Sequence, residues 1–128
     1  MLHEARRSLH FCLYPIGTAV VVSPASSEIF YIVNSEMVGG IFADMAGRVS
    51  VSGDQSITFE CRVRRIGAAS FLLATATLSA GTDFKKTTTA VNATYKLVEG
   101  DIVYIRISAM GSGGGAIPTG FTAYVTFK

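Results

Sequence analysis

Two histidines, two cysteines and one close pair of carboxylates are the residues of this chain whose types could perform chemistry. His3 and His10 lie near the start, and the sequence contains no HExxH or paired CxxC motif. A zinc site or a catalytic triad would need such further ligands or partners close by. Cys12 and Cys61 each fall within an apolar segment, which favours small buried thiols over a disulfide or a metal pair. We therefore predict no catalytic residue, no metal and no cofactor.

Two further motifs resemble active-site elements. Glu99 and Asp101 flank Gly100 and suggest a two-carboxylate glycosidase. Residues two apart at a strand entrance point the same way and lie too near each other for that geometry, so we predict a turn. The glycine run 112–115 follows a strand as a phosphate loop would, but no lysine follows it, and Pro118 and another strand replace the expected helix. The glycine run is therefore predicted to form the tip of a long hairpin. With both motifs set aside, we do not expect the chain to be an enzyme.

Short alternating segments separated by turn residues make up the chain from Leu9 onward. The predicted strands cover residues 10–14, 18–22, 28–33, 47–52, 56–65, 71–78, 102–107 and 121–127, and residues 43–46 are expected to form one helical turn. Strands spaced in this way without a sustained helical period predict an all-β fold, an antiparallel jelly roll or β-sandwich. We divide the chain into an extended N-terminal arm, residues 1–9, and a single jelly-roll domain, residues 10–128.

Period-two alternation assigns the faces of these strands. In residues 47–52, Val49 and Val51 are expected to point inward. Two longer inward rows are predicted in the segments 56–65 and 121–127, and they consist of Ile57, Phe59, Cys61 and Val63, and of Phe121, Ala123, Val125 and Phe127. In the segment 56–65, Arg62 and Arg64 are expected to point outward. They form either a solvated strand face or a basic contact face for an acidic partner surface.

The composition is short of charge. Charged residues make up 16% of the 128 residues and hydrophobic residues 49%, whereas an average soluble domain has about 25% charged residues. Part of the exterior is therefore expected to face another subunit, and the alternative is a monomer covered by threonine and serine. A net charge of +2 is too small to indicate nucleic acid. No apolar run is long enough to span a membrane.

The end of the chain resembles a known family. Leu97, Gly100, Asp101 and Val103 form an apolar-x-x-Gly-Asp-x-apolar strand entry, and a glycine-rich loop and an aromatic closing strand follow it. This arrangement resembles the closing strands of the trimeric jelly-roll heads typified by the complement globular head and the tumour necrosis factor family. It is also similar to the small knobs and decoration proteins of tailed bacteriophages.

The resemblance implies a mechanical function. Such a protein would be a capsid decoration (cement) protein on the capsid surface of the virion, assembled in the host cytoplasm, and would bridge neighbouring subunits of the major capsid protein. It would associate with itself, as a homotrimer or alternatively a dimer. The N-terminal arm would grip the capsid through apolar and charged anchors, which are Leu2, Arg6, Arg7, Leu9 and Phe11.

The alternative function is that of a receptor-binding knob of a tail or head fibre. Its exposed recognition loop would contact a host glycan or protein. The loop residues concerned are Ser112, Gly113, Gly114, Ile117 and Thr119. A third class, a small lectin-like or cupin-like enzyme, would need clustered polar groups facing the interior, whereas the predicted inward rows are apolar.

Overall fold

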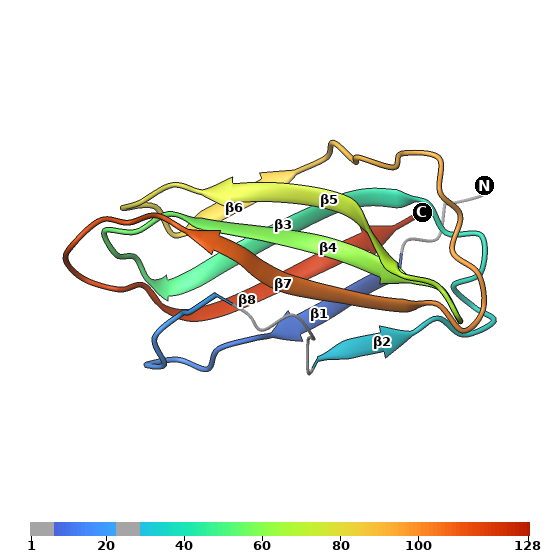
Figure 1. Ribbon diagram of the computed structural model, residues 1–128, viewed down its shortest axis with the longest axis horizontal. Helices are drawn as coiled ribbons and strands as arrows, with labels where there is room; N and C mark the ends of the chain where they lie inside the picture. Colours follow the sequence, from blue (N-terminus) through green and yellow to red (C-terminus); the bar gives the residue numbers. More distant parts are fainter. Residues whose placement is uncertain (1–6, 23–28) are drawn as a thin grey trace, which may run out of the picture.

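The computed structural model describes residues 7–22 and 29–128, and this part of the chain forms eight strands in two four-stranded antiparallel sheets (Figure 1). Sheet A has the order β1 (Arg7–Cys12), β8 (Thr119–Phe127), β3 (Phe42–Val51) and β6 (Phe84–Thr87). Sheet B has the order β2 (Phe30–Ile32), β7 (Ile102–Met110), β4 (Ile57–Arg64) and β5 (Ser70–Leu78).

The path of the chain between the sheets defines the fold as a jelly roll. Every connection except that between β4 and β5 passes from one sheet to the other, and the first and last strands lie side by side in sheet A. Two four-stranded sheets interleaved in this way are the arrangement of an eight-stranded jelly roll. The predicted all-β, antiparallel fold class is therefore confirmed.

The core lies between the two sheets, where the predicted inward rows meet. All eight residues of the rows on β4 and β8 are buried. Phe59 of β4 and Phe121 of β8 pack edge to face across the layers, with ring centroids 5.3 Å apart. Gly47 of β3 makes room for them, because a Cβ there would lie 2.8 Å from the Cζ atoms of both rings. The aromatic pair therefore fills the space that a side chain at this position of β3 would need.

Three predictions for single elements were wrong. Residues 43–46 are part of β3 and not a helical turn, because residues 44–46 pair with β8, and the register shifts just before them. Residues 18–22 form no strand, although Ala19 makes an isolated bridge to Thr119 and Val20 is buried. Val51 shares the inward parity of the buried Val49, but it lies at the end of β3, beyond the core, and is 60% exposed.

The predicted N-terminal arm also needs correction where the structure describes it. β1 begins at Arg7 and pairs antiparallel with β8 along its whole length, from Arg7 opposite Phe127 to Cys12 opposite Thr122. Leu9 and Phe11 point into the core of their own chain, and Phe11 is 1% exposed. They are not exposed anchors, because alternation along a paired strand turns them inward. Leu2 and Arg6 lie outside the described residues.

Among the described residues, the structure contains no helix of the length and apolar character that crossing a membrane requires.

Candidate functional site

The outer face of sheet A brings together side chains from strands that are far apart in the sequence. Strand register aligns them in two rows that run across the sheet. The first row consists of Cys12, Thr122, Arg48 and Phe84, and the second of His10, Tyr124, Ala46 and Lys86. Every one of the four strands contributes one residue to each row, so this surface exists only when all four strands are paired.

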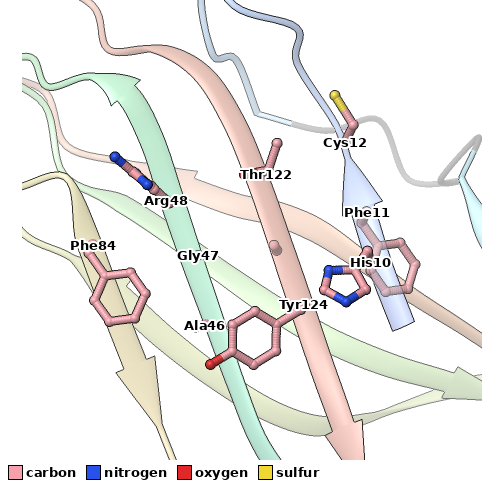
Figure 2. A pocket seen from close by; sticks show the side chains of 10 residues that line it. His10, Phe11, Cys12, Ala46, Gly47, Arg48, Phe84, Thr122 and Tyr124 are labelled. Carbon is pink, nitrogen blue, oxygen red and sulfur yellow. The ribbon is translucent and has the colours of Figure 1, made fainter. Parts of the chain in front are cut away.

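All of these residues except Lys86 line a groove with a volume of about 510 Å³ (Figure 2). Ala46 and Gly47 form a low floor because neither has a side chain larger than a methyl group. Phe84, which is 52% exposed, stands on one side. On the other side the rings of His10 and Tyr124 pack at 5.9 Å between centroids. The groove therefore has aromatic walls and a floor of small residues.

The groove continues beyond Arg48. A second hollow, with a volume of about 740 Å³, shares Cys12, Arg48 and Thr122 with the first. It extends towards the connection after β1, and its further lining residues are Tyr14, Pro15, Ile16, Ser50 and Gly120. Arg48 and Thr122 therefore lie in the middle of an elongated depression, which we call the sheet A groove.

Four polar side chains of the sheet A groove have no polar partner among the described residues, whereas Tyr14 and Ser50 in the second hollow donate to backbone carbonyls. The side chains of Arg48, Thr122, Tyr124 and His10 make no hydrogen bond or ion pair with any residue in the described ranges 7–22 and 29–128. Next to the groove, Lys86 Nζ lies 3.6 Å from Asp44 Oδ2, so that lysine has an acidic partner. Binding sites typically carry a few convergent polar groups of this kind on a largely apolar lining.

The outer face of sheet B differs, because its charges bind one another. Glu60 of β4 is buried, and its Oε1 lies 2.8 Å from Arg106 Nε and 3.1 Å from Arg62 Nη1. Arg62 also donates to the hydroxyl of Ser70 at 3.1 Å and to its carbonyl at 3.3 Å. Of the two residues in the predicted basic contact face, Arg62 has its charge neutralised within the chain, and Arg64 is exposed.

An apolar surface lies beside Arg64 on the same face. Phe30 and Ile32 of the edge strand β2 are 48% and 62% exposed. They lie opposite Tyr104 and Ile102 of β7, and we call these four residues the β2 patch. The residue between the two points inward: Tyr31 packs edge to face on Phe11 at 5.1 Å and donates its hydroxyl to the carbonyl of His10 at 2.6 Å. These contacts hold the short edge strand β2 in place.

The glycine-rich segment between β7 and β8 is tied to the turn after β3. Asp54 N donates to the carbonyl of Ala116, and Ala116 N donates to Asp54 Oδ2, both at 2.8 Å. A Cβ at Gly113 or Gly115 would collide with Asp54, so close packing explains these two glycines. Of the predicted recognition loop, Ser112, Gly113, Gly114 and Ile117 are exposed, and Thr119 is the first residue of β8. Recognition by this loop stays a prediction.

The residues weighed for catalysis have structural environments. Glu99 is exposed, whereas Asp101 is buried and accepts hydrogen bonds from Tyr95 Oη at 2.5 Å and from Val98 N at 2.9 Å. Desolvation, followed by this bond to Asp101, raises the pKa of Tyr95 to about 12. Burial raises the pKa of the Cys61 thiol, and Glu60 adds to this shift. No group of three or more potential metal ligands occurs among the described residues.

Comparison with known proteins adds one solved structure to these observations. No family model and no curated protein matches the chain. The strand order places the protein in the class of antiparallel jelly rolls. It is similar to the globular domain of zebrafish complement 1qA protein, with 13% sequence identity, a TM-score of 0.45, and coverage of 98% of this chain and 96% of that chain.

Sequence reasoning found parts of these surfaces and missed the sheet A groove. The inward row predicted for the last strand leaves Thr122 and Tyr124 on the opposite face, and the structure places them there. Nothing in the local pattern places Arg48 or Phe84 beside these two residues. The signal that could have identified the groove is the register between β3, β6 and β8, which is a property of the assembled sheet.

Proposed function

We propose that this protein is a virion structural protein that decorates the outside of a tailed-phage capsid and bridges neighbouring subunits of the major capsid protein. The β2 patch is the observation that carries this proposal. Exposed edge strands invite pairing with other chains, and aromatic residues and arginine are enriched where proteins bind proteins. Phe30 and Ile32 offer apolar area, and the exposed Arg64 provides a charged rim next to them.

Self-association is the second part of the proposal. A chain with 16% charged residues leaves part of its exterior apolar, and a homotrimer is the first expectation and a dimer the second. An oligomer that contacts the shell at several points gains avidity, because the second and third contacts form within an already bound particle. The arm anchors Leu9 and Phe11 play no part in this contact, since they are buried.

The decisive experiment measures occupancy on undecorated heads of the source virus. Ile32→Lys places a charge in the β2 patch and should lower occupancy at least tenfold, since each 1.4 kcal/mol of lost contact energy is a factor of ten. Val91→Lys makes the same kind of change at an exposed valine outside the patch and should bind like the wild type. Equal occupancy of both variants would contradict the proposal, and the particle mass in solution tests self-association separately.

A second candidate function is supported by the sheet A groove. A receptor-binding knob that recognises a host glycan needs a recessed surface with free hydrogen-bonding groups, and the groove provides one. Location separates the two functions. Labelled protein over the whole head supports decoration, whereas protein confined to the tail tip or to fibre ends supports the knob.

A further inference from the structure

We propose that the sheet A groove binds a carboxylated oligosaccharide, with the guanidinium of Arg48 receiving the carboxylate. This inference deepens the receptor-binding candidate by naming a substrate class. It rests on that candidate for its biological role, while the binding itself is a property of the purified chain.

The backbone beneath the groove indicates that side chains recognise the ligand. The backbone groups of β8 and β3 beneath it are engaged in pairing, β8 with β1 and β3, and β3 with β8 and β6. An extended peptide that binds by strand addition needs a free sheet edge. The middle of a four-stranded sheet offers none, so the partner has to be recognised by the side chains above the sheet.

The aromatic walls of the groove can pack against a sugar ring. Phe84 and Tyr124 present aromatic surface to the hollow from its two sides (Figure 2), and such surface packs against the apolar C–H face of a pyranose. The hydroxyls of Thr122 and Tyr124 and the imidazole of His10 are free to exchange hydrogen bonds with sugar hydroxyls. A site that combines apolar packing with unpartnered polar groups discriminates strongly in favour of a ligand that satisfies them.

The charge of the groove selects the acidic form of such a sugar. Arg48 has no acidic partner among the described residues, whereas neighbouring Lys86 is paired with Asp44. A guanidinium binds a carboxylate through two parallel hydrogen bonds, which makes arginine specific for this planar anion. Because Arg48 lies where the two hollows join, sugar units on both sides of the carboxylate can occupy the groove.

The test compares two probes with the same sugar backbone, tetragalacturonate and its methyl ester, in which each carboxylate is neutralised and carries a methyl group. With the isotopically labelled full chain, the acid should shift the backbone NMR signals of residues 10–12, 46–48 and 122–124 and give a saturable calorimetric isotherm. The ester should bind at least tenfold more weakly. Arg48→Gln should weaken binding of the acid by a similar factor, and Arg48→Lys, which keeps the charge and loses the fork geometry, should fall between Arg48→Gln and the wild type.

Arg65→Gln is the matched control. Arg65 directly follows β4, away from the groove, and its guanidinium carbon lies 5.7 Å from the centroid of the Tyr95 ring. This variant should bind the acid like the wild type. Equal binding of acid and ester, or signal shifts confined to sheet B, would overturn the proposal. Absence of binding together with solvent protection of the groove in the self-associated particle would also overturn it and would assign the groove to a second copy of the chain. Location on the virion, measured separately, tests the receptor role.

Discussion

Arginine has opposite surroundings on the two outer faces of this jelly roll. On sheet B, Arg62 and Arg106 both contact the buried carboxylate of Glu60, so their charges are neutralised within the chain. On sheet A, Arg48 points into a groove where no described residue binds it. The carboxylate of Glu60 leaves these two arginines no charge to offer a partner, whereas an unpartnered guanidinium above a hollow is available to a ligand. Residue type alone therefore does not distinguish a structural arginine from a binding one.

The two faces also differ in shape. Sheet B presents exposed apolar side chains on an edge strand, Phe30 and Ile32, and such a surface fits a large, flat partner. Sheet A is hollowed over Ala46 and Gly47 and fits a ligand small enough to enter. The two proposals therefore concern different faces, a macromolecular contact on sheet B and ligand recognition on sheet A, so each can be tested without disturbing the other.

The largest expected contrast concerns the two thiols. The prediction of two buried thiols was wrong for Cys12, which is exposed on the groove face, whereas Cys61 is buried in the core with a raised thiol pKa. Iodoacetamide should label Cys12 in the native protein at least about 10³-fold faster, because Cys61 reacts only in the small unfolded fraction. Peptide mass spectrometry over time measures both rates, and denaturant should make them equal. Similar native rates would show that the two sheets separate readily.

The next contrast tests the close approach of the sheets beneath the groove. Gly47→Ala places a methyl group 2.8 Å from the rings of Phe59 and Phe121, and overpacking of this kind should lower the free energy of unfolding by about 1–3 kcal/mol. Gly114→Ala is the control, because a Cβ there meets nothing within 4 Å, and it should change stability by no more than about 0.5 kcal/mol. Urea unfolding of both variants measures the difference. A neutral Gly47→Ala variant would mean that the sheets can move apart without cost.

A smaller contrast compares the two arginines directly. Arg62→Gln removes one cation from Glu60 and a donor from Ser70, so it should cost about 1 kcal/mol of stability, given that the pair is partly exposed. Arg48→Gln removes no described contact and should stay within about 0.5 kcal/mol of the wild type. Chemical unfolding at pH 7 measures both values. If Arg48→Gln proves as costly as Arg62→Gln, the groove arginine has a structural partner.

The smallest expected effect is a dependence of stability on pH that arises at Tyr95, outside the sheet A groove and the β2 patch. The pKa of Tyr95 is raised to about 12, so the folded chain keeps this proton while the unfolded chain loses it near its ordinary pKa of 10. This contribution to stability is complete below pH 10 and is lost as the pH rises from about 10 to 12. Tyr95→Phe should lose less stability across that window than the wild type does. Denaturant unfolding at pH 9, 10 and 11 gives the two slopes, and identical slopes would refute the assignment.

The fold was predictable because its signal is local. Rows such as Phe121, Ala123, Val125 and Phe127 identify strands with one buried face, and the absence of a helical period excludes the other classes. The predictions failed where pairing decided the outcome. Residues 43–46 resemble a helical turn in isolation and are part of β3 because β8 lies beside them, and Leu9 and Phe11 turn inward because β1 pairs with β8.

The chain alone determined that strands with one apolar face must stack into a sandwich, since alternation with period two is visible residue by residue. It also determined that few charges cover the exterior. The tertiary structure decided which outward side chains become neighbours: Arg48 meets Thr122, and Glu60 meets Arg106, across segments far apart in the sequence. Strand register depends on the packing of the whole sheet, and for this reason the groove and the ion cluster became visible only in the folded molecule.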